Sequence, residues 1–176
     1  MKVTKATLDD IGRLQQFRRD AAAWLTARGS DQWSTSYPEG LLRASIKAGD
    51  VFLFYADERD PVATVTLDTN ADPILWQPEE IREPALYVHK LTLADPGGGN
   101  GLGSQILDWC GDRAAKADAL WLRLDAWTTS TGLHTYYRSQ GFSHLRTVHD
   151  ERAYRSGWVA QRPAEFRDVG FDGPEE

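Results

Sequence analysis

The sequence predicts an α/β (α+β) protein, and three observations support this fold class. Residues 86–127 read as a strand, a glycine-rich turn, a helix and a second strand. Residues 51–67 contain two apolar, β-prone runs around a polar turn, which is typical of a β-hairpin. The chain has 176 residues, of which 41% are hydrophobic and 26% are charged, as in ordinary globular domains. We therefore expect one domain over residues 1–162 and an acidic tail over 163–176.

The first part of the chain alternates between strand and helix signals. Residues 2–7 alternate polar and apolar side chains, which predicts a short strand. An aspartate at position 9 or 10 can cap a helix that runs to about Arg28, because apolar side chains recur there at helical spacing. A second helix is predicted over residues 39–48. A glycine directly follows each helix, which is a common signal for a helix end.

The two strands of the predicted hairpin are residues 51–56 and 62–67. Residues 69–85 contain three prolines and predict an irregular segment. Toward the C-terminus the pattern predicts a strand, a short helix, two final strands and a loose tail, over residues 120–126, 131–140, 142–148, 156–161 and 163–176. The strand at 120–126 should pair in parallel with the strand at 86–93, because a helical crossover connects them.

The turn between the strand at 86–93 and the helix at 102–118 is the most informative segment. It contains five glycines within the seven residues 97–103. Such a backbone can turn sharply and leave its N–H groups uncovered, and the following helix adds the positive end of its dipole. These features predict a site for an anion, most often a phosphate. The alternative is a long solvated loop between a strand and a helix.

The residues of this turn do not fit two common nucleotide sites. A nucleotide-triphosphate loop needs Lys and then Ser or Thr after its last glycine, whereas Ser104 and Gln105 follow Gly103. A dinucleotide loop has the spacing G-x-G-x-x-G, whereas these glycines stand at positions 99, 101 and 103. The pattern therefore favours a pyrophosphate held by backbone N–H groups without a metal.

Composition narrows the class of protein further. The net charge of −6, with no basic stripe, argues against a nucleic-acid partner. No apolar run is long enough to span a membrane, and the N-terminus lacks a signal peptide, so we expect a cytoplasmic location and no membrane partner. The single cysteine, Cys110, falls on the apolar stripe of a predicted helix and should be a core residue. No His/Cys/Asp cluster has metal-ligand spacing.

Two motifs make the chain resemble the GCN5-related N-acetyltransferase (GNAT) family. The family's acetyl-CoA loop, Arg/Gln-x-x-Gly-x-Gly/Ala, resembles residues 98–103, although Gly98 replaces Arg or Gln. A later family motif places an aromatic residue four positions before Gly-Phe, and Tyr137 stands four positions before Gly141-Phe142. Both motifs occur in the expected order and between the expected elements. The resemblance covers residues 1 to about 161.

The resemblance implies a mixed, mostly antiparallel central sheet of about six to seven strands, flanked by about four helices. A central parallel pair would be splayed where acetyl-CoA binds, and a bulge near Leu91 would free a backbone N–H for the thioester oxygen. The implied cofactor is acetyl-CoA as acyl donor, without a metal. The implied acetyl-CoA residues are Leu91, Leu93, Gly98, Gly99, Asn100, Gly101, Leu102, Gly103, Ser104, Ser130 and Tyr137. Ser130 stands where the family often has Asn.

The resemblance also implies catalytic roles in the attack of an amine on the thioester. Tyr137 would protonate the CoA thiolate, because a phenol and a thiol have similar reference pKa values; the alternative is that it only packs between helix and sheet. His89 would act as general base. It lies two residues before Leu91, so strand alternation should place both side chains on one face. A structural histidine is the alternative, and Asp125 competes as base or as anchor of the amine.

The acceptor site is predicted from four further residues. Asp31 and Trp33 lie in the loop after the first helix, where the family forms one wall of the acceptor pocket. A turn with one anchoring tryptophan is an equal alternative for this loop. Asp125 and Trp127 stand at the end of a strand that should border the same pocket. His134 is near the later motif and is expected to be a solvated residue.

Two functions from different classes follow from the sequence. The first is an acyltransferase that moves acetyl from acetyl-CoA to a primary amine, with a small cationic amine as the favoured partner. The second is a catalytically silent acyl-CoA-binding module that senses or scaffolds. The resemblance also suggests a homodimer, because dimers are common in the family.

Overall fold

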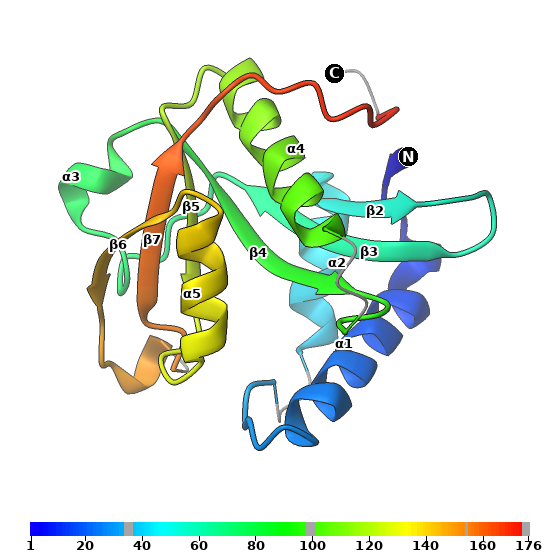
Figure 1. The fold of residues 1–176 in the computed structure, drawn as a ribbon, viewed down its shortest axis with the longest axis horizontal. Helices are drawn as coiled ribbons and strands as arrows, with labels where there is room; N and C mark the ends of the chain where they lie inside the picture. Colours follow the sequence, from blue (N-terminus) through cyan, green and yellow to red (C-terminus); the bar gives the residue numbers. More distant parts are fainter. Residues whose placement is uncertain (34–36, 98–100, 154, 174–176) are drawn as a thin grey trace. The chain divides into compact units, whose positions relative to one another are not determined.

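Seven β-strands form one mixed sheet in the computed structural model, which describes residues 1–33, 37–97, 101–153 and 155–173 (Figure 1). The strand order is β1-β2-β3-β4-β5-β7-β6. Strands β4 and β5 pair in parallel, whereas β1–β2, β2–β3, β5–β7 and β6–β7 pair in the antiparallel sense. This is the mixed, mostly antiparallel sheet that the sequence predicts.

The chain clusters into two compact units. The first unit contains Met1–Leu67, Lys90–Gly103 and Gly170–Glu176, and the second contains Asp68–His89 and Ser104–Val169. Strand β4 (Ala85–Leu93) contributes residues to both, because the boundary falls between His89 and Lys90.

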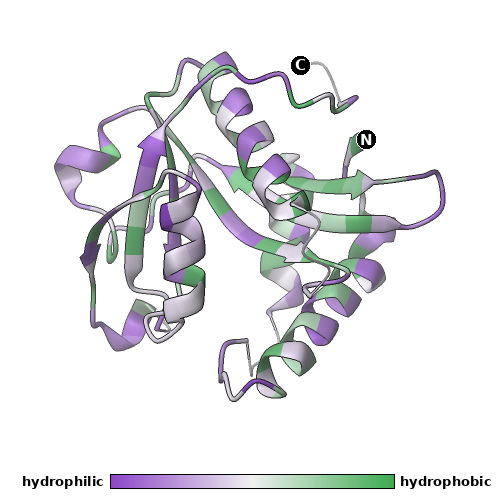
Figure 2. Ribbon diagram, viewed as in Figure 1, coloured by the Kyte–Doolittle hydropathy of each residue, from purple (hydrophilic) through white to green (hydrophobic). Residues whose placement is uncertain are grey.

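The first unit contains the N-terminal strands and two helices: β1 (Lys2–Lys5), a 3₁₀ turn (Leu8–Asp10), α1 (Ile11–Thr26), α2 (Glu39–Ala48), β2 (Val51–Tyr55) and β3 (Pro61–Asp68), whose last residue belongs to the second unit. Thr7 is the N-cap of this helical segment, and Asp10 completes a capping box, because its carboxylate accepts the N–H of Thr7 at 2.8 Å. Gly49 ends α2 in the left-handed conformation, as the sequence predicts. Strands β2 and β3 are mostly hydrophobic in Figure 2, and the turn that joins them is hydrophilic.

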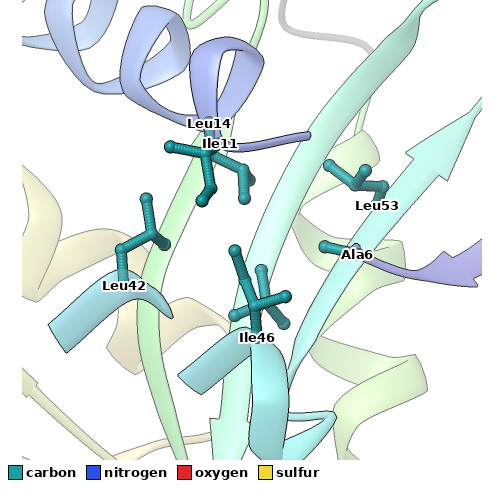
Figure 3. Close-up of a cluster of buried hydrophobic side chains, with 7 residues drawn as sticks. Ala6, Ile11, Leu14, Leu42, Ile46 and Leu53 are labelled. Atoms are coloured by element: carbon teal, nitrogen blue, oxygen red, sulfur yellow. The ribbon is translucent and has the colours of Figure 1, made fainter. Parts of the chain in front are cut away.

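The core of the first unit lies where α1 and α2 pack on β2. Ile11 and Leu14 from α1 and Leu42 and Ile46 from α2 gather around Leu53 (Figure 3). Leu53 has no exposed surface. This packing explains why a short amphipathic segment such as 39–48 is helical: burial of one apolar face stabilises helices that would be marginal in isolation.

The second unit contains the remaining elements: α3 (Pro78–Ile81), α4 (Leu102–Lys116, from Ser104 onward), β5 (Trp121–Ala126), α5 (Thr131–Ser139), β6 (Ser143–Thr147), a 3₁₀ turn (Glu151–Ala153) and β7 (Trp158–Pro163). Side chains of α4 and β5 that have no exposed surface include Ile106, Leu107 and Leu122. Cys110 is also fully buried, and burial raises the pKa of its thiol to about 12. The prediction that Cys110 is a core residue is confirmed.

A buried arginine, Arg123, connects several segments of the second unit. Arg123 of β5 has 0% exposure, and its guanidinium bonds the carboxylate of Glu83 at 2.5 Å and the amide of Gln161 at 2.9 Å. It also donates to the hydroxyl of Tyr87 at 3.2 Å and to the carbonyl of Glu80. A buried guanidinium is tolerated only with such a set of acceptors, so these contacts fix Tyr87 and the start of β4.

Two sequence predictions are corrected by the fold. Helix α3 lies inside the segment that was expected to be irregular, because Pro78 occupies the first helical position, where proline is favourable, and Glu80 accepts the N–H of Gln77 at 2.8 Å. The tail is not loose at its described end. Asp172 forms a bridge with Lys2, and its carbonyl accepts the N–H of Val3 at 2.7 Å.

The described residues include no helix that combines the length and the apolar character needed to cross a bilayer. Within the same residues, no group of three or more His, Cys, Asp or Glu side chains is arranged to hold a metal ion.

We expect Gly157→Ala to lower the free energy of unfolding by at least about 2 kcal/mol. A Cβ at this position would lie 1.8 Å from the carbonyl oxygen of Val148. The backbone at Val148 is fixed beside Gly157, because the Val148 N–H donates a 2.8 Å hydrogen bond to the Gly157 carbonyl. Urea unfolding measures the change. Gly12→Ala is the control, because no heavy atom of the described residues lies within 4 Å of that Cβ and alanine favours a helix; equal stability of both variants would contradict the prediction.

Candidate active site

Strand β4 carries a local distortion at Lys90. This residue has φ +54° in the middle of the strand, and its carbonyl accepts the hydroxyl of Thr92 at 2.9 Å. A left-handed residue inside a strand is typical of a β-bulge. It stands next to Leu91, where the sequence predicts a bulge. It also interrupts the alternation from which His89 and Leu91 were expected to share a face, and both side chains are half-buried.

The glycine-rich segment is described only in part. Gly98, Gly99 and Asn100 lie outside the described residues. Gly101 adopts φ +75°, and an added Cβ would find no heavy atom of the described residues within 4 Å. Helix α4 begins at Leu102 directly afterward. An uncovered left-handed glycine before a 15-residue helix fits an anion that approaches the backbone closely.

The other predicted acetyl-CoA residues have different surroundings. Leu91 and Leu93 of β4 are half-buried, and Leu102 is buried. The hydroxyl of Ser104 donates to the side-chain amide oxygen of Gln140 at 2.5 Å. Ser130 stands at the start of α5, where its N–H donates to the carbonyl of Trp127 at 3.1 Å. The roles of these residues in binding acetyl-CoA stay predictions.

His89 lies between two carboxylates in the second unit. Its Nε2 is 3.3 Å from Oδ1 of Asp68, and its Nδ1 is 3.8 Å from Oδ1 of Asp125. The side chains are 25%, 10% and 18% exposed, respectively. The ring of Tyr87 lies nearly parallel to that of His89, with centroids 6.4 Å apart. The imidazole is thus held in one orientation but stays open to solvent in part.

Each carboxylate is itself held by a donor. Burial by itself would raise the pKa of Asp68, but the hydrogen bond and charge of His89 and the N–H of Asn70 outweigh it, so the pKa lies below its ordinary value. The Asn70 N–H bonds Oδ1 at 2.8 Å. The hydroxyl of Ser156 donates to Oδ2 of Asp125 at 2.5 Å. Both aspartates are therefore oriented toward the imidazole.

The sequence prediction missed Asp68 and Ser156. The sequence did contain a signal for Asp68, because this residue directly follows the predicted strand 62–67. That strand ends the predicted hairpin, and the next predicted strand along the chain carries His89, so the two strands could be expected to lie side by side. Ser156 left no such signal, because it begins the predicted strand 156–161, and the sequence did not indicate that this strand pairs with the strand that carries Asp125.

Tyr137 lies in an aromatic cluster on α5. Its ring packs edge-on against Phe142 at 5.8 Å and stacks on Trp158 at 6.3 Å. Burial, followed by the charges of Tyr136 and Asp125, raises the pKa of the Tyr137 phenol well above its usual range. The phenol is therefore within electrostatic range of the Asp125 carboxylate. The raised pKa favours the protonated form of the phenol, and it also makes the phenol a weaker acid than its reference pKa implies.

The prediction that His134 is solvated is wrong. Its side chain is buried, its Nε2 lies 2.8 Å from the carbonyl of Trp127, and its ring stacks on Trp158 at 4.4 Å. Burial lowers the pKa of His134. The helical spacing that turns Tyr137 inward also turns His134 inward, because the two positions are three residues apart on α5.

The predicted acceptor residues of the first unit lie in the loop after α1. Asp31 is exposed, and Trp33 is half-buried with φ +63°. The guanidinium of Arg18 lies 4.3 Å from the centroid of the Trp33 ring. One face of Trp33 is thus covered by a cation of this chain, which agrees with the anchoring alternative. Trp127 of the second unit is half-buried.

No family model matches the chain. Over 134 residues, however, the chain is 32% identical to the uncharacterized N-acetyltransferase YesJ of Bacillus subtilis (strain 168), with 70% of this chain and 71% of YesJ covered. The chain belongs to the GNAT family of N-acetyltransferases. It is accordingly an acetyltransferase enzyme.

Solved structures of GNAT acetyltransferases share the fold. One from Listeria monocytogenes has a TM-score of 0.75 and 21% identity, and covers 92% of this chain and 93% of that chain. One from Streptococcus agalactiae has a TM-score of 0.72 and 15% identity, with 93% and 95% covered. The PaiA N-acetyltransferase of Thermoplasma acidophilum, in complex with coenzyme A, has a TM-score of 0.66 and 17% identity, with 92% and 97% covered. The GNAT fold predicted from the sequence is confirmed.

Proposed function

We propose that this enzyme transfers the acetyl group of acetyl-CoA to the primary amine of a small molecule by direct attack. Acetyl-CoA supplies an activated carbonyl carbon to the amine nitrogen. Two structural neighbours support the donor and the size of the acceptor. PaiA was solved with coenzyme A, and the N-acetylglutamate synthase of Neisseria gonorrhoeae was solved with coenzyme A and N-acetyl-glutamate. The latter has a TM-score of 0.66 and 16% identity to this chain.

The position of His89 between Asp68 and Asp125 is the observation that carries the proposal. An amine arrives as an ammonium ion at neutral pH and must lose a proton before its nitrogen can attack. An imidazole is suited to take that proton near neutral pH. Two neighbouring carboxylates stabilise the imidazolium that forms. Tyr137 then donates its phenolic proton to the sulfur that leaves.

The grip on the donor is proposed to come from backbone groups. The left-handed Gly101 and the N–H groups at the start of α4 would hold the pyrophosphate. Leu91 and Leu93 would align the pantetheine arm along β4. The distortion at Lys90 would present a backbone N–H near Leu91 to the carbonyl oxygen, where negative charge develops. Gly98, Gly99, Asn100, Ser104 and Ser130 complete the proposed set.

The acceptor is proposed to be a cationic amine. Asp125 would bind its ammonium group, and Trp127 would lie against its apolar part. Asp31 and Trp33 are proposed as further acceptor residues of the first unit. The negative charges of Asp68 and Asp125 beside His89 favour a cationic amine over a neutral peptide as the acceptor.

Steady-state release of free CoA tests the proposal. Purified protein is assayed with acetyl-CoA and a panel of polyamines, monoamines, amino acids and neutral peptides. We expect turnover with small amines. Binding of acetyl-CoA by calorimetry without turnover on any amine would contradict the proposed function, and activity confined to neutral peptides would contradict the acceptor class.

We expect Tyr137→Phe to lower kcat about 10- to 100-fold and to leave the affinity for coenzyme A within about 2-fold. The phenyl ring keeps the packing against Phe142 and Trp158, so only the proton donor is removed. The loss should persist at mildly alkaline pH, because the raised pKa of the phenol favours its protonated form. Tyr136→Phe is the matched control, since Tyr136 is the adjacent, half-buried tyrosine of the same helix. Unchanged kcat in Tyr137→Phe would remove the acid role from this residue.

A further inference from the structure

The two ring nitrogens of His89 face two carboxylates that come from different strands. Asp68 ends β3 and lies 3.3 Å from Nε2, whereas Asp125 is in β5 and lies 3.8 Å from Nδ1. A neutral imidazole has one N–H and one nitrogen lone pair. Only one of the two carboxylates can therefore accept a hydrogen bond from the neutral ring.

The geometry favours Asp68 as that acceptor. It is the closer carboxylate and the less exposed one, at 10% against 18% for Asp125. Its Oδ1 is fixed by the N–H of Asn70 at 2.8 Å, so it does not swing away from the ring. A more buried and better-fixed acceptor stabilises an N–H more strongly. The neutral ring should therefore carry its proton on Nε2.

The Nδ1 lone pair faces Oδ1 of Asp125, while Ser156 donates to the other carboxylate oxygen at 2.5 Å. A protonated amine that reaches Nδ1 can donate one of its N–H groups to this lone pair. A primary ammonium ion has three such N–H groups, and a neutral amide nitrogen has fewer.

We propose that Asp68 is the positioning residue that holds the proton on Nε2 of His89, so that the lone pair on Nδ1 can take a proton from the acceptor's ammonium group. This inference rests on the proposed function. Nδ1 accepts one ammonium proton, the N–H bond of the ammonium breaks, and its electron pair stays on the amine nitrogen. The imidazolium then has an N–H toward each aspartate, with its charge balanced by Asp68.

Two carboxylates from neighbouring strands face His89, and an aromatic ring lies beside it on its own strand. Asp68 faces it from β3 and Asp125 from β5. On β4 itself the Tyr87 ring lies alongside, and the hydroxyl of Tyr87 accepts a hydrogen bond from Arg123. The ammonium of Lys90 lies over the Tyr37 ring at 4.2 Å. The two aspartates are therefore the groups whose removal should alter proton transfer at His89.

The tautomer can be observed without any turnover. Nitrogen-15 NMR of histidine-labelled protein at a pH above the histidine transition separates the two neutral forms, and His89→Gln assigns the signals. We expect the Nε2–H tautomer at His89. An Nδ1–H tautomer would overturn the proposal, whatever the outcome of the amine panel, so its failure is distinguishable from that of the proposed function.

The kinetic test uses Asp68→Asn, with Asp72→Asn as the matched control. Asp72 accepts the N–H of Ile74 at 2.8 Å, just as Asp68 accepts the N–H of Asn70. We expect Asp68→Asn to lower kcat at least about 10-fold and to move the acidic limb of its pH profile to lower pH, because the imidazolium loses a neighbouring charge. The affinity for coenzyme A should not change. Loss of stability with an unmoved acidic limb, or unchanged kcat, would assign Asp68 a purely structural role and overturn the proposal.

Discussion

Gly101→Val is expected to weaken the binding of coenzyme A at least about 100-fold, which corresponds to about 2.7 kcal/mol. Gly101 has φ +75°, a conformation that a β-branched residue adopts only with strain. The valine would either shift the backbone and misdirect the N–H groups before α4 or place its methyl groups where the pyrophosphate must approach. Either effect removes the proposed grip. Isothermal calorimetry with coenzyme A gives the affinity directly.

A second left-handed glycine supplies the control for this experiment. Gly29 has φ +77° and, like Gly101, would place an added Cβ more than 4 Å from every described heavy atom outside its immediate chain neighbours. Gly29→Val should therefore cost similar stability but leave the affinity for coenzyme A unchanged. If Gly101→Val and the unmodified protein bind coenzyme A with equal affinity, the hypothesis that backbone N–H groups hold the pyrophosphate is wrong. If both variants lose affinity equally, strain anywhere in the first unit is sufficient to weaken binding.

His89→Ala is expected to lower kcat/KM for an amine about 100-fold or more at neutral pH. The acidic limb of the pH profile should disappear, because no imidazole remains to take the ammonium proton. The affinity for coenzyme A should stay within about 2-fold, since His89 is not among the groups proposed to hold it. Stopped assays of CoA release across the pH range, with calorimetry alongside, measure the three quantities.

The matched control for this variant is His149→Ala, which removes an exposed histidine of the second unit. Its kinetics should equal those of the unmodified protein. If the acidic limb of His89→Ala is unaltered, the base is Asp125 or a water molecule. If His89→Ala loses affinity for coenzyme A as well, the histidine has a structural role in β4.

Most of the fold was predictable from local patterns. The helix at Glu39–Ala48 has the predicted bounds, because an amphipathic stripe and a terminal glycine act within a few residues of each other. The parallel pair followed from the helical crossover between residues 93 and 121. Helix α3 was not predicted, because three prolines in its segment indicate irregular structure. Pro78, however, stands at the first helical position, where proline is favourable. The contact of the tail with β1 was not predictable from local patterns, because the bridge between Asp172 and Lys2 joins opposite ends of the chain.

The candidate site was predictable only where motifs are local in sequence. Tyr137 was chosen over Tyr136 because its spacing from Gly141-Phe142 matches the family, and its burial agrees with an inward-facing position. The solvent exposure expected for His134 was wrong, because the burial of a side chain on α5 depends on the sheet that the helix covers. Asp68 was overlooked, because strand pairing rather than sequence distance brings it to His89.

Local chemistry therefore accounts for the order of elements, the glycine-rich turn and the family motifs, because turns, caps and periodicity depend on neighbouring residues. The partners of His89 depend on long-range pairing. Asp68, His89 and Asp125 come from three strands, and Ser156 reaches Asp125 across 31 positions. Their contacts exist only after the sheet has formed, because distances of 3–4 Å between such residues depend on strand register and side-chain packing.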